Sequence, residues 1–296
     1  MNEQPPRFLV LANPNSGRAA TGLAAALNVL VEADVDFQLT RPRSTEALQE
    51  AIRSRGPSFD GVVIAGGDGT VNAAAGAIAE IDRPMGILPF GTANDLAHTL
   101  GVPVSPTAAA AVIVAGHRRR IDLGRVNDCV FVNAASLGLP VMVAECLDPE
   151  LKRRFKSFSY VVATFRALKT IRRFTARITV DGQRSELKAL QVTVGNGERF
   201  GGGMRVGSSP AIDDGMLDVF AIEAETLGDL IHAAPAIRFG LQDSNPHTRT
   251  FRGRDVHVET NRPMPINTDG EICTETPARF SVQRSALAVY VPYDGT

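Results

Sequence analysis

One short segment combines the residue types and the spacing that bind phosphate. An apolar run at 62–65 leads into Gly66-Gly67-Asp68-Gly69-Thr70-Val71-Asn72. A strand that passes through glycines into a helix brings backbone N–H groups and the positive end of the helix dipole close to a ligand, and both favour phosphate. Asp68 would repel phosphate there unless a Mg²⁺ ion lay between the two groups. The spacing fits an ordinary strand-to-helix turn with Asp68 as N-cap equally well, and it matches neither the Walker A loop nor the dinucleotide fingerprint.

Two further polar loops that contain glycine follow apolar runs of the same kind. Asn13-Pro14-Asn15-Ser16-Gly17 follows the run at 7–12, and Pro89-Phe90-Gly91-Thr92-Ala93-Asn94-Asp95-Leu96-Ala97 follows the run at 85–89. Ligands of open parallel sheets bind beyond the carboxyl ends of the strands, so three such loops can line one crevice. Each loop alone is more often a turn, and the coincidence of all three favours a nucleotide site.

The elements that must position these loops alternate between strands and helices. Strands are predicted at 7–12, 37–40, 61–65 and 85–89, and helices at 21–33, 44–54 and 107–115. The last helix follows Ser105-Pro106 and precedes Gly116, a suitable cap at each end. This alternation predicts an α/β fold with an N-terminal, doubly wound parallel-sheet domain.

The sequence period changes after about Val126. Segments 176–181 and 254–259 alternate apolar with polar residues, which is typical of antiparallel strands with one solvated face. Asp181-Gly182 is predicted to be a hairpin turn, and Asn196-Gly197 is predicted to close a second one. We therefore expect a C-terminal, mainly antiparallel β-sandwich domain that forms a tight interface and a cleft with the first domain, where ligands usually bind.

Composition and charge exclude several classes of protein. The chain has 296 residues, of which 44% are hydrophobic and 21% are charged, values typical of a folded globular protein. The net charge of −1 argues against a general nucleic-acid binder, which needs a broad excess of Lys and Arg. The sequence has no uninterrupted apolar run of about 18 residues and no secretory signal, so a cytoplasmic protein is expected.

The cysteines bear on the redox state of the protein. Cys129, Cys146 and Cys273 are odd in number, and their spacing suits neither a disulfide framework nor a zinc site. We expect all three thiols to be reduced and buried.

A basic segment runs from 151 to 177, with nine Lys or Arg residues and no acidic residue. Its apolar residues are spaced as one face of a helix: Phe155, Phe158, Val161, Val162, Phe165, Leu168 and Ile171. We expect this helix to bury its apolar face while the basic residues contact anionic lipid headgroups, each contact worth about 1 kcal/mol. The alternative is a helix packed on the core with a solvated basic face.

Together these motifs resemble the diacylglycerol kinase catalytic domain, and most closely that of the soluble bacterial lipid kinases. The resemblance continues through Ile121-Asp122-Leu123-Gly124, Asn196-Gly197 with Gly201-Gly202-Gly203, Asp213-Asp214-Gly215-Met216-Leu217-Asp218-Val219 and Asp269-Gly270-Glu271. It covers nearly the whole chain. The run Gly-Gly-Asp-Gly-Thr alone is less specific, because NAD kinases share it and phosphofructokinases have a similar one.

The resemblance implies sites for ATP and Mg²⁺. ATP is expected to contact Asn13, Pro14, Asn15, Ser16, Gly17, Thr40, Gly66, Gly67, Asp68, Gly69, Thr70, Val71, Asn72 and Thr92. A structural Mg²⁺ site maps onto the Asp214 carboxylate and the backbone carbonyls of Ala211 and Met216, with Asp122 in the water network around the ion. Without the resemblance, Asp213-Asp214-Gly215 would be interpreted as a β-turn.

The resemblance also implies catalytic residues. Glu271 matches the general base that takes the proton of the acceptor hydroxyl during phosphoryl transfer. Asp68 and Asp95 match acidic residues that hold catalytic Mg²⁺ or orient the acceptor. From the residues alone, Glu271 is an ordinary surface glutamate, and Asp95 is a favourable charge at the start of a helix.

The predicted function is that of an ATP- and Mg-dependent lipid kinase, with diacylglycerol as the first expected acceptor. The first predicted domain, 1–125, would bind ATP, and the second, 126–285, would bind the lipid substrate and the structural Mg²⁺. Residues 286–296 would form a C-terminal segment, and one option is that this segment returns to the first domain. The enzyme would contact the inner, anionic face of a membrane transiently. The choice between monomer and homodimer stays open.

Two alternatives belong to other classes. An NAD kinase shares the Gly-Gly-Asp-Gly-Thr run, but Gly91-Thr92-Ala93-Asn94-Asp95 and Asp269-Gly270-Glu271 disfavour it. A catalytically inactive nucleotide- or lipid-binding module would be favoured by loss of the motif acids. All four are present: Asp68, Asp95, Asp214 and Glu271.

Overall fold

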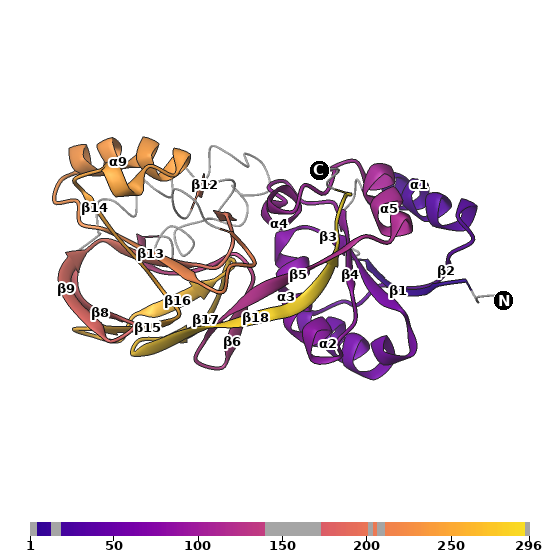
Figure 1. The fold of residues 1–296 in the computed structure, drawn as a ribbon, viewed down its shortest axis with the longest axis horizontal. Helices are drawn as coiled ribbons and strands as arrows, with labels where there is room; N and C mark the ends of the chain where they lie inside the picture. Colours follow the sequence, from indigo (N-terminus) through magenta and orange to yellow (C-terminus); the bar gives the residue numbers. More distant parts are fainter. Residues whose placement is uncertain (1–4, 13–18, 140–172, 201–203, 206–210, 294–296) are drawn as a thin grey trace. The chain divides into compact units, whose positions relative to one another are not determined.

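The structure, a computed structural model, describes residues 5–12, 19–139, 173–200, 204–205 and 211–293 (Figure 1). The chain divides into two compact units. Unit 1 comprises Met1–Leu123, Ile212–Asp214 and Gln283–Thr296, and unit 2 comprises Gly124–Ala211 and Gly215–Val282. Each unit is therefore assembled from segments that are distant in the sequence.

Unit 1 contains a parallel sheet. Its strand order is β2 (Asp36–Thr40), β1 (Arg7–Ala12), β3 (Gly61–Gly66) and β4 (Met85–Pro89). Every residue of β3 and β4 is buried, as expected for strands covered on both faces. Next to β4, Val289 of β18 (Ala278–Tyr290) pairs in parallel with Met85. All four predicted strands are present, and two of them, β1 and β4, have the predicted bounds.

Helices cover both faces of this sheet, with α1 and α5 on one face and α2 and α3 on the other (Figure 1). The bounds are α1 Ala19–Glu32, α2 Thr45–Arg55, α3 Asp68–Glu80, α4 Asp95–Thr99 and α5 Pro106–Ala115, with a 3₁₀ turn at Gly56–Ser58. The Ser44 hydroxyl caps α2 by accepting the Ala47 N–H at 3.2 Å. The α5 helix begins at Pro106 and is followed by Gly116 at a φ of 76°. The predicted doubly wound α/β domain is confirmed.

Unit 2 contains two antiparallel sheets. The first sheet has the order β18, β15 (Asp255–Thr260), β8 (Phe174–Val180) and β9 (Gln183–Ala189). The second has the order β14 (Thr248–Gly253), β13 (Leu217–Ile222), β10 (Gln191–Gly195), β7 (Ala134–Gly138), β16 (Pro265–Thr268) and β17 (Glu271–Glu275). In addition, β5 (Arg118–Val126) pairs with β18 and with β6 (Cys129–Phe131), and β11 (Arg199–Phe200) pairs with β12 (Met204–Arg205).

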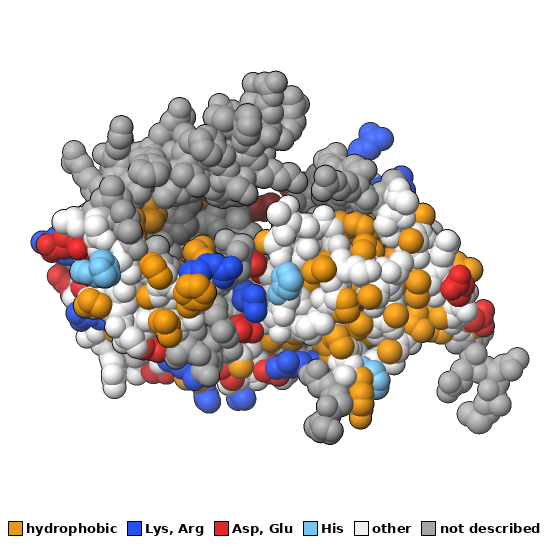
Figure 2. Space-filling model, turned by 90° about the horizontal axis from the view of Figure 1, so that it is seen from above, with side chains coloured by type: hydrophobic (Ala, Val, Ile, Leu, Met, Phe, Trp, Pro, Cys, Tyr) orange, Lys and Arg blue, Asp and Glu red, His pale blue; other side chains and the backbone are white. Residues whose placement is uncertain are grey.

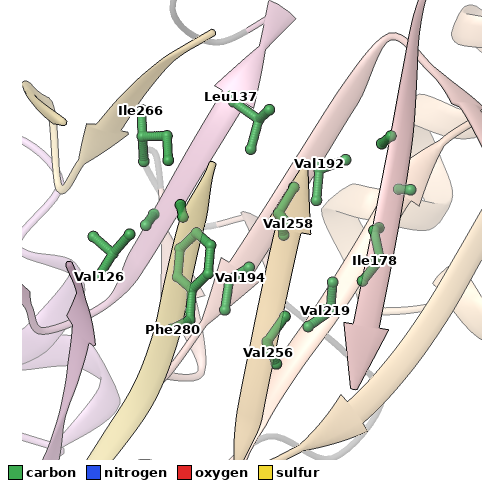
Figure 3. Packing of buried hydrophobic residues seen from close by; sticks show 14 of the residues in the cluster. Val126, Leu137, Ile178, Val192, Val194, Val219, Val256, Val258, Ile266 and Phe280 are labelled. Atoms are coloured by element: carbon green, nitrogen blue, oxygen red, sulfur yellow. The ribbon is translucent and has the colours of Figure 1, made fainter. Parts of the chain in front are cut away.

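Apolar side chains from the two sheets meet in one core (Figure 3). Phe280 and Val258 face this core from the first sheet, and Val194 and Val219 face it from the second. Burial of a side chain of this size stabilises the fold by about 1.5–3 kcal/mol. The two sheets therefore form the predicted mainly antiparallel β sandwich.

Helix α9 (Leu227–Phe239) covers the outer face of the second sheet (Figure 1). Its Ala233 and Ile237 pack with Phe220 and Ile222 of β13. The helix begins with a capping box, in which the Thr226 hydroxyl accepts the Asp229 N–H and the Asp229 carboxylate accepts the Thr226 N–H. A 3₁₀ turn at Gln242–Ser244 follows.

The cysteines depart from the prediction. Cys129 of β6 and Cys273 of β17 form a disulfide across 144 residues. Cys129 is half-buried and Cys273 is exposed, so the prediction of reduced, buried thiols is wrong for both. The pair could not be inferred from spacing, because β6 meets the β16–β17 hairpin only in the folded chain. Cys146 lies outside the described residues.

Most of the basic segment, 151–172, lies outside the described residues, together with the apolar face of its predicted helix. The two basic residues of the segment that are described form ion pairs. Arg173 lies 2.8 Å from a carboxylate oxygen of Glu225, and Arg177 of β8 lies 2.8 Å from one of Glu186. Because Arg177 belongs to a strand, a helix that extends through residue 177 is ruled out.

In the part of the chain that the structure describes, no helix combines the length and the apolar character needed to span a bilayer. Figure 2 shows hydrophobic side chains spread over the face of unit 1 that carries α1 and α5. Val31 of α1 and Val114 of α5 are among the exposed apolar residues of this unit.

Candidate active site

The loops after β3 and β4 touch through their backbones. A Cβ atom on Gly67 would lie 2.9 Å from the Cα of Gly91, closer than any side chain tolerates. Phe90 donates its N–H to the Gly66 carbonyl at 2.9 Å, which continues the contact between the two loops. Gly67 and Gly91 are therefore required by the packing of one loop on the other.

Gly69 differs from these two glycines. It is exposed, and a Cβ atom at this position would meet nothing within 4 Å. Gly69 lies in the first turn of α3, where unpaired N–H groups and the helix dipole attract anions. The structure therefore offers open space for a phosphate at Gly69, which suits the nucleotide expected here.

The Asp68 carboxylate joins the same two loops. Its Oδ2 accepts the Asn94 N–H at 2.8 Å, and its Oδ1 accepts the Asp95 N–H at 2.6 Å. Asp68 is the first residue of α3, and Gly67 takes the N-cap position of that helix. The N-cap interpretation of Asp68 is thus wrong for α3, because the carboxylate holds the start of α4 instead.

Asn94 fixes the loop that leads into α4. It has a left-handed backbone with a φ of 50°, a conformation that Asn tolerates better than most residues. Its Oδ1 accepts the Gly91 N–H at 2.9 Å, and its Nδ2 donates to the Gly91 carbonyl at 3.2 Å. Sequence reasoning did not assign Asn94 a role of its own. The sequence feature that could have indicated such a role is an Asn placed between a glycine and a helix that begins with an acidic residue.

Asp95 is the first residue of α4 and is only 5% exposed. A charge buried to this degree needs polar partners, and the residue does make further interactions. The fold therefore brings Asp68 and Asp95 together at the carboxyl edge of the parallel sheet. The sequence predicted a role for each residue, but not the direct bond between them.

The other predicted ATP contacts differ in their position and in their exposure to solvent. Thr40 ends β2, and its hydroxyl accepts a hydrogen bond from Nη1 of Arg55 at 2.9 Å. Thr92 is exposed in the loop after β4, whereas Val71 is buried inside α3. The Oδ1 atom of Asn72 is buried and has no hydrogen-bond donor among the described residues. Asn13 to Gly17 lie outside the described residues.

The predicted structural Mg²⁺ site falls on the loop before β13. The loop is tied to β5 because Asp122, buried in that strand, donates its N–H to the Ile212 carbonyl at 2.8 Å. The Asp122 Oδ1 accepts the Ser285 N–H at 2.6 Å. Within the loop, Asp213 forms an ion pair with Arg119 at 2.7 Å, and Asp214 is half-buried.

The donor set of this loop suits a hard cation. One carboxylate from Asp214 and backbone carbonyls from Ala211 and Met216 are oxygen ligands of the kind that Mg²⁺ prefers. No group of three His, Cys, Asp or Glu side chains able to hold a metal is found in the described ranges, so any ion here depends on the carbonyls.

Glu271 is the exposed first residue of β17, directly after the turn Asp269-Gly270. The turn residues have φ angles of 50° and 107°, as in a tight two-residue hairpin. The Asp269 carboxylate accepts three consecutive backbone N–H groups, from Val132 at 2.6 Å and from Asn133 and Ala134 at 3.0 Å. The hairpin end is thereby held to the loop between β6 and β7.

Asn196-Gly197 meets the same loop. The N–H groups of both residues donate to the Asn133 carbonyl, at 2.8 and 3.0 Å, and the Asn196 Nδ2 donates to the Val132 carbonyl at 2.8 Å. The strand before them, β10, pairs with β13 and β7. The prediction that Asn196-Gly197 closes a hairpin is therefore wrong, because these residues bind a segment that is distant in the sequence.

Comparisons with known proteins agree with this architecture. Residues 7–126 match the family described as diacylglycerol kinase catalytic domain, and residues 133–291 match the YegS C-terminal NAD kinase beta sandwich-like domain. The chain belongs to the family that combines these two domains, the diacylglycerol kinase catalytic-domain family. It is accordingly a lipid kinase.

Relatives of similar length carry the corresponding name. A diacylglycerol kinase of Staphylococcus saprophyticus is 29% identical over 294 residues, which cover 97% of this chain and 96% of the relative. One from Staphylococcus aureus is 28% identical over 293 residues, covering 97% and 93%. A crystal structure from Bacillus anthracis, described provisionally as a diacylglycerol kinase, is similar with a TM-score of 0.86, at 28% identity over 99% and 97% of the two chains.

Proposed function

We propose that this protein transfers the γ-phosphate of ATP to the hydroxyl group of a diacylglycerol-type lipid in a Mg-dependent reaction. The observation that supports this most directly is the hydrogen bonding of one carboxylate, Asp68, to the backbone of Asn94 and Asp95. Two separate motifs of the kinase family thereby form one preorganised loop pair beside the open start of α3. Phosphoryl transfer depends chiefly on such positioning and on electrostatic stabilisation.

In this proposal the nucleotide lies along the carboxyl edge of the parallel sheet. The open backbone at Gly69 and the first turn of α3 would receive phosphate oxygens, and the exposed Thr92 would contact the nucleotide. Asp68 and Asp95 would hold catalytic Mg²⁺ or orient the acceptor. When bound there, Mg²⁺ would neutralise charge on the transferring phosphate.

Glu271 is proposed as the general base. Its carboxylate is exposed at the start of a strand, where it can accept the proton of an acceptor hydroxyl. In the loop before β13, Asp214 with the carbonyls of Ala211 and Met216 would hold a second, structural Mg²⁺. The hydrogen bond between Asp122 and Ile212 supports a fixed loop conformation there.

Each domain would have its own role. Residues 1–125 would bind ATP, and 126–285 would bind the lipid and the structural ion. The segment 286–296 would return to the first domain, which is supported by the parallel pairing of Val289 with Met85.

Contact with an anionic membrane surface is proposed for the basic segment. Of its cations, Arg173 and Arg177 are paired with glutamates, so the proposal rests on the remaining Lys and Arg residues.

One assay separates the proposed reaction from its rivals. Purified protein is incubated with radiolabelled ATP, Mg²⁺, total lipid extract and NAD. Label in the organic phase supports the lipid kinase reaction, and resolution of the labelled lipids identifies the acceptor. Label in NADP would favour the NAD kinase alternative, to which the fold of the second domain is related. Label in neither product would favour an inactive binding module.

A further inference from the structure

Unit 2 contains two Asp-Gly turns that are built in the same way. Asp181 and Gly182, between β8 and β9, have φ angles of 46° and 85°, close to the corresponding turn at Asp269 and Gly270. In each turn the aspartate donates its N–H to a carbonyl of a neighbouring segment at 3.0 Å, Asp181 to Asp255 and Asp269 to Ala134. Each turn is therefore docked onto a segment distant in the sequence.

The aspartate side chains of the two turns also make similar hydrogen bonds. The Asp181 carboxylate accepts the N–H groups of Arg254 and Asp255 at 3.0 Å, two consecutive donors. The Asp269 carboxylate accepts three consecutive donors, from Val132 to Ala134. A row of backbone N–H groups stabilises a carboxylate strongly, because each bond is assisted by its charge.

The two turns lead into different residues. Gln183 comes after the Asp181 turn, whereas Glu271 comes after the Asp269 turn. The strand that carries Glu271, β17, is the last in its sheet, and four of its five residues are exposed. Its pairing with β16 shifts register between Ile266 and Asn267, which leaves Cys273 as the extra residue of a bulge. Because β17 is an exposed and irregular edge strand, its own pairing constrains the position of its first residue, Glu271, only weakly.

The anchored turn holds the first residue of β17 in place, which the strand itself does only weakly. Gly270 donates its N–H to Asn267 Oδ1 at 2.8 Å, and Thr268 pairs with Glu271 across the hairpin. Asp269 then holds the whole hairpin end to the loop between β6 and β7. We propose that Asp269 is a positioning residue for Glu271: its carboxylate sets where the general base stands. This inference rests on the proposed role of Glu271.

The first test compares Asp269→Asn with its structural twin, Asp181→Asn. Asparagine keeps the shape and tolerates the positive φ, but its amide group directs N–H donors at the backbone N–H groups that the carboxylate accepts. Both variants should lower the melting temperature. Only Asp269→Asn should lower kcat, by about 10²-fold, as expected for a displaced catalytic group, with an unchanged KM for ATP. Equal kcat in wild type and Asp269→Asn, or equal losses in both variants, would overturn the proposal.

A double-mutant cycle gives the decisive readout. If Asp269 acts through Glu271, adding Asp269→Asn to Glu271→Gln should cause no further loss of kcat. A multiplicative loss would mean that Asp269 acts independently. If Asp269→Asn does not fold, Asn267→Ala enters the same cycle, because it removes the hydrogen bond from the Gly270 N–H that also holds the turn.

The cycle also separates this inference from the proposed function. Wild-type turnover in Glu271→Gln would remove the general base and the positioning role together. No labelled lipid from the wild-type protein would reject the proposed function itself. A strong loss in Glu271→Gln combined with wild-type kcat in Asp269→Asn would overturn the positioning role alone.

Discussion

The backbone N–H of Asp95 donates to Oδ1 of Asp68 at 2.6 Å, although the two residues are 27 positions apart in the sequence. This bond makes the Asp68 carboxylate both a candidate ligand at the active site and a structural support of α4. Substitutions can separate the two roles. The support of α4 needs only the backbone N–H of Asp95, whereas the proposed reaction needs the Asp95 side chain.

Asp68→Ala should therefore lose stability as well as activity. It removes the acceptor of two backbone N–H groups, and hydrogen bonds to a charged partner contribute roughly 1.5–3 kcal/mol. Asp95→Asn keeps the N–H donor and should lose activity with a smaller change in stability. Urea unfolding measures both variants. Equal stability of Asp68→Ala and wild type would show that the bond contributes nothing.

Asp214→Ala should remove stabilisation by Mg²⁺. An ion that binds only the folded state stabilises it by about 2.7 kcal/mol at a concentration one hundred times its Kd. Wild type should melt at a higher temperature in Mg²⁺ than in chelator, and Asp214→Ala should not. Asp213→Ala is the matched control, because that residue forms a surface ion pair with Arg119. An equal Mg²⁺ shift in all three proteins would rule out Asp214 as a ligand.

Reduction of the Cys129–Cys273 disulfide should lower the melting temperature. A bond that joins residues 144 positions apart restricts the unfolded chain, and such crosslinks contribute about 2–4 kcal/mol. Calorimetry with and without dithiothreitol measures the change. The variant Cys273→Ser should melt like the reduced wild type, whether or not the reductant is present. A reductant effect of the same size in Cys273→Ser would have another origin.

The Asp181 turn should make stability depend on pH. The N–H groups of Asp255 and Arg254 hold the pKa of the Asp181 carboxylate below its ordinary value. The stability that it contributes is therefore fully present above the unfolded-state pKa of about 3.9 and is lost as the pH falls through the lower pKa of the folded state. The difference in melting temperature between wild type and Asp181→Asn should accordingly shrink below about pH 4. A constant difference from pH 7 to acid would contradict the assignment.

Charge reversal should test membrane recruitment. Changing Lys152, Arg153, Arg154 and Lys156 to Glu should weaken binding to anionic vesicles and raise the apparent KM for lipid presented in them. Wild-type binding should fall with salt, because the Debye length shortens from about 10 Å at 0.1 M to about 3 Å at 1 M. A short-chain soluble lipid is the control. Equal losses on soluble and vesicle substrate would contradict recruitment.

The fold was predictable where local pattern decides it. The strands β1 and β4 have the predicted bounds, because each is an apolar run with polar or turn residues on both sides. The cap of α2 by Ser44 was likewise local. These elements depend on residues within a few positions of one another, and a single sequence contains that information.

The hydrogen-bond partners of the candidate site residues were not predictable from the sequence. Asn196-Gly197 has the composition of a hairpin turn, yet its N–H groups bind Asn133, which no local rule can anticipate. The same limit applies to Asp269 and to the disulfide, whose partners are distant in the sequence. The contact between Gly67 and Gly91 was not predictable either. The two glycines lie 24 positions apart in the sequence, and only the fold brings one loop onto the other.

The pairing of Val289 with Met85 has a consequence for the order of folding during synthesis. Unit 1 contains Met1–Leu123 and also Gln283–Thr296, so its sheet is completed by a strand that is translated after all of Gly124–Val282. At about 5–20 residues per second, translation from Pro89 at the end of β4 to Val289 takes roughly 10–40 s. During that time β4 presents an unpaired edge of the kind that promotes association between chains. Truncation before Val289 should leave that edge open permanently.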